Sequence, residues 1–243
     1  MLIAGGASAI GGATTRALAD AGAKVAFTYM TSADEAGTIE REYTSTSGQV
    51  LGLQANMMKP EGIAEVVQCT EQDFGPLDVL FVNSGGFLKG SRCIDATLQP
   101  WHEANSLDLL STFLVVQGTL RSMDPRKSGS IVLMSSLAVF DGSGHGASHY
   151  ATAKGPLATL VRSLAKEVGP LGIRVNGVAP GLIGTRFHDT FNTPQGRAES
   201  IAKTPLRREG TPQDLAGTVL YLASEQAAYV TGEVVQINGG IGF

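Results

Sequence analysis

Residues 4–12, Ala-Gly-Gly-Ala-Ser-Ala-Ile-Gly-Gly, are the stretch that decides the fold. They follow the short apolar run at 1–4 and precede a segment with helical periodicity near 11–21. Glycines there permit a tight turn and let the backbone approach a pyrophosphate, whose charge the free N–H groups of a helix N-terminus stabilise. The place of this turn after the first strand favours a dinucleotide-binding turn over the plain strand-to-helix turn that the same glycines allow.

The order of an apolar run, a turn and a helical segment repeats along the whole chain. The predicted strands are 1–4, 24–29, 49–54, 77–82, 129–135, 172–179 and 232–237. The predicted helices lie near 11–21, 33–46, 60–73, 100–122, 148–168 and 212–224. This alternation predicts an α/β fold, namely a single doubly wound Rossmann-type domain over 1–243 with a seven-stranded parallel sheet and helices on both faces.

A ligand of such a sheet binds beyond the carboxyl ends of the strands, so functional residues are expected in the turns after strands. In this chain those turns are 4–12, 83–90, 136–149 and 180–190. Twelve of the chain's 31 glycines lie in these four turns, which is where the backbone has to pass close to a ligand or bend around it.

The composition excludes several classes of protein. The 243 residues include 31 glycines without a three-residue repeat and are 43% hydrophobic, which excludes collagen-like and disordered chains. A net charge of −4 without basic runs argues against nucleic-acid binding. No apolar run approaches the ~20 residues of a membrane span, and the start of the chain has no basic leader, so a cytoplasmic protein is expected. Cys69 and Cys93 are too few and too isolated for a disulfide framework or a metal site.

A tyrosine and a lysine four residues apart, Tyr150 and Lys154, begin the long helix predicted over 148–168. Positions four apart share a helix face, so the lysine ammonium can lie close to the phenol and stabilise its phenolate form. That arrangement suits a general acid and base working near neutral pH. The alternative is a core ring with a surface charge.

Ser135 ends the predicted strand at 129–135 and Ser136 directly follows it, so both lie at the ligand edge of the sheet. A serine at the end of a strand is ordinarily a turn residue. Its hydroxyl can also donate a hydrogen bond to the oxygen of a reacting carbonyl, where negative charge develops.

Together these residues resemble the short-chain dehydrogenase/reductase family, and the resemblance spans essentially the whole chain. The stretch at 4–11 is similar to the family's TGxxxGIG turn, and NSGG at 83–86 stands where NNAG is usual. The tyrosine–lysine pair and the preceding serine match in order, with one residue more than usual between Ser136 and Tyr150. Length and motif order resemble the branch of 3-oxoacyl carrier-protein reductases. Further matches are Trp101, IRVNGVAPGLIGT at 173–185 and TGEVVQINGG at 231–240.

The resemblance implies hydride transfer between a nicotinamide cofactor and a carbonyl or secondary alcohol. Tyr150 would be the acid and base, Ser136 would hold the carbonyl oxygen, and Lys154 would stabilise the phenolate and bind ribose hydroxyls. The cofactor would be bound by Gly5, Ser8, Ala9, Ile10, Tyr29, Thr31, Ser32, Asn56, Met57, Asn83, Gly85, Tyr150, Lys154, Pro180, Gly181, Ile183 and Thr185.

Four positions depart from the family pattern. Ala4 lacks a threonine hydroxyl, Ala9 replaces a glycine, and Asn56 replaces an aspartate that accepts from the adenine amino group. Asp108 stands where the family has a catalytic asparagine that helps hold a water in a proton relay to the lysine. An ionised aspartate accepts hydrogen bonds but does not donate them, so Asp108 is a candidate for the relay with altered chemistry.

The end of the second predicted strand bears on the choice of cofactor. Family members that use NAD typically have an acid there, which accepts from the ribose 2′-hydroxyl and repels a 2′-phosphate. Residues 28–32, Thr-Tyr-Met-Thr-Ser, carry no acid before Asp34, and no arginine or lysine either. Hydroxyl and N–H groups there favour NADP(H) over NAD(H) as the cofactor, and no metal is expected.

Substrate contacts are expected from the segment after the fourth strand, the loop before Tyr150 and the stretch 186–204, which is long enough to form a lid. The candidate residues are Phe87, Phe140, His145 and Phe187. A 3-oxoacyl thioester, a sugar, a steroid and an aromatic ketone all remain open as substrates.

The leading interpretation is a carbonyl reductase that uses NADP(H). The alternatives are an NAD-dependent alcohol dehydrogenase and a non-catalytic dinucleotide-binding sensor. The partner is then a small carbonyl or alcohol, with neither nucleic acid nor membrane. The resemblance also implies a homo-tetramer or dimer through the helices near 100–122 and 148–168 and the C-terminal strand. Four apolar residues could serve this interface or pack only on the sheet, namely Leu157, Leu160, Val161 and Leu164.

Overall fold

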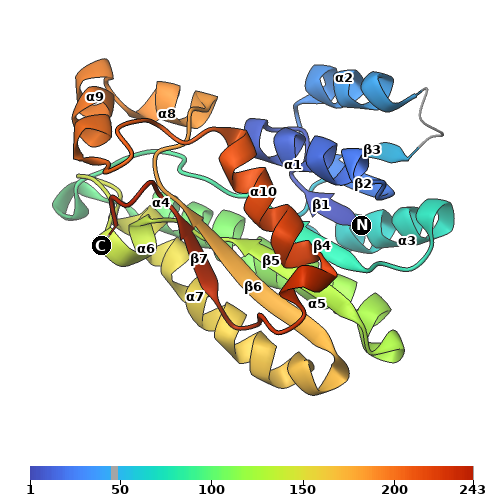
Figure 1. Ribbon diagram of the computed structural model, residues 1–243. Coiled ribbons are helices and arrows are strands. Elements are labelled where there is room, and N and C mark those ends of the chain that lie inside the picture. The colour runs from blue at the N-terminus through green and yellow to red at the C-terminus, as the bar shows by residue number, and fades with distance from the viewer. Residues whose placement is uncertain (45–48, 243) are drawn as a thin grey trace.

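The computed structural model describes residues 1–44 and 49–242. Its centre is one parallel sheet with the strand order β3-β2-β1-β4-β5-β6-β7 (Figure 1). The strands are β1 (Leu2–Ala4), β2 (Val25–Tyr29), β3 (Val50–Gln54), β4 (Val79–Val82), β5 (Gly129–Met134), β6 (Ile173–Pro180) and β7 (Val234–Ile237). The order reverses between β1 and β4, so the crossovers lead to opposite edges and leave a crevice at this point. The predicted seven-stranded Rossmann-type α/β fold is confirmed.

Helices cover both faces of the sheet (Figure 1). Buried side chains of α3, α5 and α7 pack on one face, and those of α1, α2 and α10 pack on the other. The helices are α1 (Ala9–Asp20), α2 (Ala33–Tyr43), α3 (Pro60–Phe74), α4 (Leu98–Ala104), α5 (Ser111–Met123), α6 (Ala138–Asp141), α7 (Ser148–Val168), α8 (Arg186–Phe191), α9 (Pro194–Lys203) and α10 (Pro212–Ala223).

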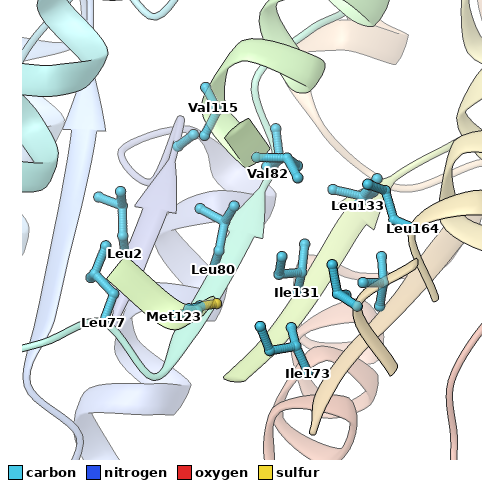
Figure 2. Packing of buried hydrophobic residues seen from close by; sticks show 14 of the residues in the cluster. Leu2, Leu77, Leu80, Val82, Val115, Met123, Ile131, Leu133, Leu164 and Ile173 are labelled. Atoms are coloured by element: carbon cyan, nitrogen blue, oxygen red, sulfur yellow. The ribbon is translucent and has the colours of Figure 1, made fainter. Parts of the chain in front are cut away.

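The central strands are continuously apolar because both of their faces are buried. In β4, Leu80 points into the cluster with α3, α5 and α7, whereas the neighbouring Phe81 points into the cluster with α1 and α10. Figure 2 shows Leu80 beside Ile131 of β5 and near Met123 of α5. Each such side chain is fully buried and contributes roughly 1.5–3 kcal/mol to the stability of the fold.

The helix predicted near 100–122 is interrupted. It consists of α4, a π-helical turn η2 (Asn105–Leu110) and α5. Within this turn the side chains of Ser111 and Thr112 donate to the carbonyls of Leu107 and Asp108, four residues earlier. Wide turns of this kind frequently accompany functional sites, and this one places the Asp108 side chain in the interior.

Other predicted boundaries differ by a few residues. The helix predicted over 33–46 ends at Tyr43, and residues 45 and 46 lie outside the described residues. The stretch 186–204, predicted only as a polar lid, contains α8 and α9, which lie outside the sheet and its covering helices (Figure 1). Thr193 caps α9 by accepting from the Gly196 N–H at 3.1 Å, which explains where this helix begins.

Three of the four apolar residues of α7 that were considered for an oligomer interface pack inside the protomer. Leu157, Val161 and Leu164 are buried, and Leu160 is partly buried against the same core cluster. The helix therefore uses these residues on the sheet, as the alternative interpretation has it. Of the helices in the described residues, none has the length and apolar character needed to cross a membrane.

Candidate active site

A cleft of about 1090 Å³ lies beyond the carboxyl ends of the strands. It is lined by the turns after β1, β4, β5 and β6 and by parts of α2, α7 and α8. These are the turns in which the sequence predicted functional residues. The predicted site residues that line it are Ser8, Ala9, Ile10, Ser32, Asn83, Gly85, Phe87, Ser136, His145, Tyr150, Lys154, Pro180, Gly181, Ile183, Thr185 and Phe187.

Other predicted site residues do not line this cleft, and two of them have a structural role instead. Asn56 accepts from the Met58 N–H at 3.0 Å and so closes its own turn. Met57 is buried in the core cluster beside α3. The residues outside the lining are Gly5, Tyr29, Thr31, Asn56, Met57, Asp108 and Phe140.

The remaining residues outside the lining flank the cleft. Gly5 has a φ of +80°, and its N–H donates to the Thr28 hydroxyl at 3.0 Å. This hydrogen bond joins the glycine-rich turn to β2. Tyr29 packs partly against the core. Thr31 is exposed, and Phe140 lies on α6 with its side chain largely in solvent.

The turn between β1 and α1 is shaped to receive an anion. The Asn83 amide donates to the Gly5 carbonyl at 2.8 Å and to the Ser8 hydroxyl at 3.0 Å, which ties the β4 end to the turn. A Cβ at Gly11 would lie 2.1 Å from the Gly5 carbonyl oxygen, so only glycine fits there. The Ser8 side chain makes no capping hydrogen bond to α1, which leaves the N–H groups of the first turn available beside the cleft. These N–H groups suit the pyrophosphate of a dinucleotide.

Tyr150 and Lys154 project from the first turns of α7 into the cleft. Lys154 is not a surface charge, because its side chain is only 3% exposed. Its ammonium donates to the Met134 carbonyl at the end of β5 at 3.1 Å. An ammonium buried next to the cleft and four residues from a phenol can stabilise the phenolate. The geometry therefore favours a general acid and base over a core ring with a surface charge.

The buried partner of Lys154 is Asp108. The Lys154 Nζ and the Asp108 Oδ1 are 3.0 Å apart, and the Asp108 side chain is fully buried. The same Oδ1 accepts from the Gly86 N–H at 2.8 Å. Asp108 therefore lies behind the lysine and links the π-helical turn to the turn after β4.

The second carboxylate oxygen of Asp108 has no hydrogen-bond partner within the part of the chain that the structure describes. Its backbone carbonyl is occupied by the Thr112 hydroxyl at 2.7 Å. The side chain that replaces the family's asparagine thus holds the lysine directly, and its spare oxygen can accept one more hydrogen bond.

Ser136 lies between the end of β5 and α6. Its hydroxyl oxygen accepts from the Ala138 N–H at 3.2 Å, which leaves the hydroxyl proton free to point elsewhere. The residue lines the cleft together with Tyr150. A carbonyl oxygen placed between the two hydroxyls would receive a hydrogen bond from each.

Aromatic rings surround Tyr150. Phe87 meets it edge-on with the ring centroids 5.7 Å apart, and Phe187 lies tilted at 6.3 Å. Two further rings join them without having been singled out from the sequence: Phe191, 4.8 Å from Phe87, and His149, stacked on Phe87 at 5.6 Å. Phe191 follows Phe187 by four residues on the same helix, so this spacing could have indicated Phe191 from the sequence. No local pattern indicated His149.

Two arginines line the opposite end of the cleft. They belong to α1 and α8, so the sequence of the second strand gave no indication of them. Arg16 of α1 is held by Glu42 through its Nε at 2.6 Å and its Nη2 at 2.9 Å. These hydrogen bonds raise the pKa of Arg16 and lower the pKa of the Glu42 carboxyl. Arg186, the first residue of α8, reaches Glu35 of α2 at 3.2 Å. Residues 28–32 themselves carry no arginine or lysine, and the cationic side chains at this end of the cleft come from α1 and α8.

Comparison with known proteins accounts for this arrangement. A sequence profile of the family described as enoyl-(acyl carrier protein) reductase matches residues 5–242. The chain belongs to the short-chain dehydrogenase/reductase family. Its relatives in this family include the 3-oxoacyl-(acyl-carrier-protein) reductase of Synechocystis sp., 33% identical over 99% of this chain and 95% of the relative. The corresponding reductase FabG of Escherichia coli is 35% identical over 99% and 96%.

Solved structures of the family superpose closely on this chain. A short-chain dehydrogenase/reductase from Serratia marcescens has a TM-score of 0.92 and 30% identity and covers 100% of this chain and 97% of its own. A blue fluorescent protein from a metagenomic library, solved in complex with NADPH, has a TM-score of 0.90 and 29% identity, with the same coverage. The chain is therefore an oxidoreductase of this family in fold and in motif order.

Proposed function

We propose that this short-chain dehydrogenase/reductase is a carbonyl reductase that uses NADPH to reduce a ketone to a secondary alcohol. The observation that carries the proposal is the gathering of Ser136, Tyr150 and a buried Lys154 in one cleft beside a turn suited to a pyrophosphate. The 3-oxoacyl-(acyl-carrier-protein) reductases among its relatives support the direction of ketone reduction.

NADPH supplies the hydride when it is bound, and the protein supplies orientation and protons. Ser136 and Tyr150 hold the carbonyl oxygen, and Tyr150 transfers its phenolic proton to that oxygen. Lys154 stabilises the phenolate that remains, and Asp108 keeps the ammonium in place. The candidate cofactor residues are those that line the cleft along the turns after β1, β4 and β6.

Preference for NADP(H) over NAD(H) is also part of the proposal. The end of β2 carries no acid before Asp34, and Ser32, Thr38, Arg16 and Arg186 line the cleft nearby. Hydroxyl groups and guanidinium groups suit a 2′-phosphate. The relative solved with NADPH supports the same choice. Because Asp34 and Glu35 line the same end, the preference has to be measured: a lower KM for NADH than for NADPH at equal turnover would reject it.

The experiment that tests the function compares the wild type with Tyr150→Phe on a panel of carbonyl compounds, following the loss of NADPH absorbance. The variant keeps the ring contacts but loses the proton donor, so we expect turnover to fall by at least about 10²-fold while NADPH binding persists. Equal turnover in both proteins would remove Tyr150 from its assigned role. Binding of NADPH without turnover of any carbonyl or alcohol by the wild type would favour a sensor. Turnover only with NAD and alcohols would favour the dehydrogenase.

We also propose that α8 and α9 form the lid of the site and that the chain forms a homo-oligomer. Phe187 of α8 lies 6.3 Å from the Tyr150 ring and Phe191 packs on Phe187 at 5.2 Å, which supports the lid. The oligomer is supported by large apolar side chains exposed along α4, η2 and α5, namely Leu98, Trp101, Leu110 and Phe113. The cytoplasmic location stays a prediction from the sequence.

A further inference from the structure

Four aromatic rings, one of them that of Tyr150, form a closed circuit of contacts in the lining of the cleft. The centroid of Tyr150 lies 5.7 Å from that of Phe87, which lies 4.8 Å from Phe191, which lies 5.2 Å from Phe187, which returns to Tyr150 at 6.3 Å. Phe87 and Tyr150 belong to the body of the protein, whereas Phe187 and Phe191 belong to α8. The ring edges and faces are mutually inclined, as aromatic groups prefer when they pack.

The backbone next to this circuit adds no side chain to the cleft. Gly86 lines the cleft, and a Cβ placed on it would find only the Phe187 Cε2 within 4 Å, at 3.9 Å, which is ordinary van der Waals contact. Residues 85 and 86 are both glycines, so the aromatic wall formed by the circuit continues directly to the main chain of the turn after β4.

The charged group nearest the circuit is paired. Lys154, four residues from Tyr150, has the buried Asp108 as its partner, whereas Arg16 and Arg186 line the opposite end of the cleft, where they pair with Glu42 and Glu35. Arg197, which anchors α9, is engaged by Glu209 and Asp189.

His188 adds no positive charge to the lid. Burial lowers the pKa of His188 below its ordinary value of 6.5, and its Nδ1 pairs with the Asn192 Oδ1 at 2.9 Å. Its ring lies against Phe187 at 5.0 Å. The wall above Tyr150 therefore offers aromatic surface in place of an anion clamp or a set of free hydrogen-bonding groups.

We propose that the substrate is a ketone whose carbonyl carries a flat aromatic substituent, which packs among Phe87, Phe187 and Phe191 while its oxygen meets Ser136 and Tyr150. This inference rests on the proposed function and names the substrate class for the same site. In the reaction the carbonyl carbon gains the hydride of NADPH and the oxygen gains the proton of Tyr150, so that an aryl secondary alcohol and NADP⁺ are released. The tyrosine regains its proton from solvent.

The same wall disfavours other classes of ketone. A polyhydroxylated ketone would place hydroxyl groups against aromatic faces, where they lose their hydrogen bonds to water without replacement. A 3-oxoacyl thioester would bring a chain without a ring, which cannot make the contacts between aromatic edges and faces. A saturated ring of the same size would fill the space but lose the directional contacts between aromatic edges and faces.

The first experiment measures kcat/KM of the wild type, with saturating NADPH, on acetophenone, cyclohexyl methyl ketone, dihydroxyacetone and acetoacetyl-CoA. One aromatic pair is worth about a two- to tenfold change, so contact with two or more rings predicts acetophenone to exceed the cyclohexyl ketone by about tenfold or more. Dihydroxyacetone and the thioester are expected to be poorer still. Equal or better turnover of the saturated ketone, the polyol or the thioester would overturn the inference. Turnover of none of these would count against the proposed function as well.

The second experiment separates the rings from the chemistry. Phe187→Leu and Phe191→Leu keep apolar bulk on α8, and we expect each to lower kcat/KM for acetophenone by about fivefold or more beyond its effect on kcat/KM for acetone. Tyr229→Leu is the matched control, since Tyr229 is fully exposed and lies outside the described cleft lining. A loss of equal size on both ketones, or no loss on acetophenone, would overturn the inference while leaving the carbonyl reductase intact. Tyr150→Phe, by contrast, should abolish turnover of both.

Discussion

At the scale of single residues, the pairing of Asp108 with Lys154 distinguishes this chain from the family pattern. A buried ammonium is stable only when its charge is compensated and its protons are hydrogen-bonded, and here Asp108 and the Met134 carbonyl do both. The carboxylate in turn is held by the Gly86 N–H. The lysine that we propose to assist Tyr150 is therefore positioned by a direct ion pair.

Removal of the Asp108 carboxylate should destabilise the fold more than neutralising it. Asp108→Ala leaves the Lys154 ammonium buried and unpaired, and we expect a loss of about 3–5 kcal/mol in the free energy of unfolding measured with urea. Asp108→Asn retains an oxygen that can accept from Lys154 and Gly86, so its loss should be smaller. Asp95→Ala is the control, because Asp95 and Arg92 form an exposed pair 3.7 Å apart, and it should change stability by less than about 0.5 kcal/mol. Equal stability of Asp108→Ala and the wild type would contradict the ion-pair account.

Gly85 is required by the same cluster. Its φ is +130°, and a Cβ there would lie 2.3 Å from the Asp108 Oδ1 and 3.0 Å from the Lys154 Nζ. We expect Gly85→Ala to lower the free energy of unfolding by about 2 kcal/mol or more and to reduce kcat, because it displaces the lysine. Gly217→Ala, inside α10 with no atom within 4 Å of its Cβ, should instead be stabilising by about 0.5–1 kcal/mol. Urea unfolding and turnover of both variants check this contrast, and a harmless Gly85→Ala would refute it.

At the scale of elements, α8 and α9 are fastened by one arginine. Arg197 of α9 donates to Asp189 of α8 and to Glu209 in the segment before α10. The hydrogen bonds with Arg197 hold the pKa of Glu209 below its ordinary value of 4.5. The next helix is fixed by a capping box in which Thr211 and Asp214 exchange hydrogen bonds. The lid thus has a defined anchor, whereas its apolar face rests on the rings around Tyr150.

The anchor predicts how the lid responds to acid. Because the pKa of Glu209 is lower in the folded state than in the unfolded state, the carboxylate contributes stability above about pH 4.5, and this contribution is lost as the pH falls through the folded value. We expect hydrogen exchange of 186–203 to accelerate, relative to that of α7, when the pH is lowered toward 4. Arg197→Leu should give the faster relative exchange already at pH 7 and should flatten the pH dependence. A lid that exchanges identically in the wild type and this variant would exclude Arg197 as its anchor.

At the scale of the whole molecule, the distribution of exposed apolar side chains supports the proposed contact between subunits. Leu98 and Trp101 of α4 and Phe113 of α5 are exposed, and Leu98 is 73% exposed. Exposed apolar groups gathered on one helical segment commonly mark contacts between subunits. Of the segments expected to form the interface, namely the helices near 100–122 and 148–168 and the C-terminal strand, these side chains favour the first.

Sedimentation tests that interface. We expect the wild type to sediment as a multiple of 25.2 kDa and the double variant Leu98→Glu, Phe113→Glu to shift toward the protomer mass. Leu206→Glu is the control, since Leu206 is also exposed but lies between α9 and α10, outside α4, η2 and α5. A wild-type species of 25.2 kDa would show that these side chains do not join subunits under the conditions used.

Much of the fold was predictable because its signals are local. Apolar runs such as that of β4, the glycine turn at 4–12 and the four-residue spacing of Tyr150 and Lys154 depend only on neighbours in sequence. The ligand edge followed from the alternation of strands and helices, since parallel strands place all their carboxyl ends on one side. The boundaries that failed lie where side chains override the helical pattern, as at the π-helical turn before Ser111.

By itself, the sequence determined the parallel sheet, the edge that holds the cleft and the residues proposed to perform the chemistry, because each follows from short-range periodicity and spacing. Only the tertiary structure decided which groups meet across the cleft. Asp108 reaches Lys154, Phe191 reaches Phe87, and two arginines from α1 and α8 arrive at the same end. The physical reason is that these contacts join residues far apart in the chain, and their energy depends on packing and burial that no local pattern encodes.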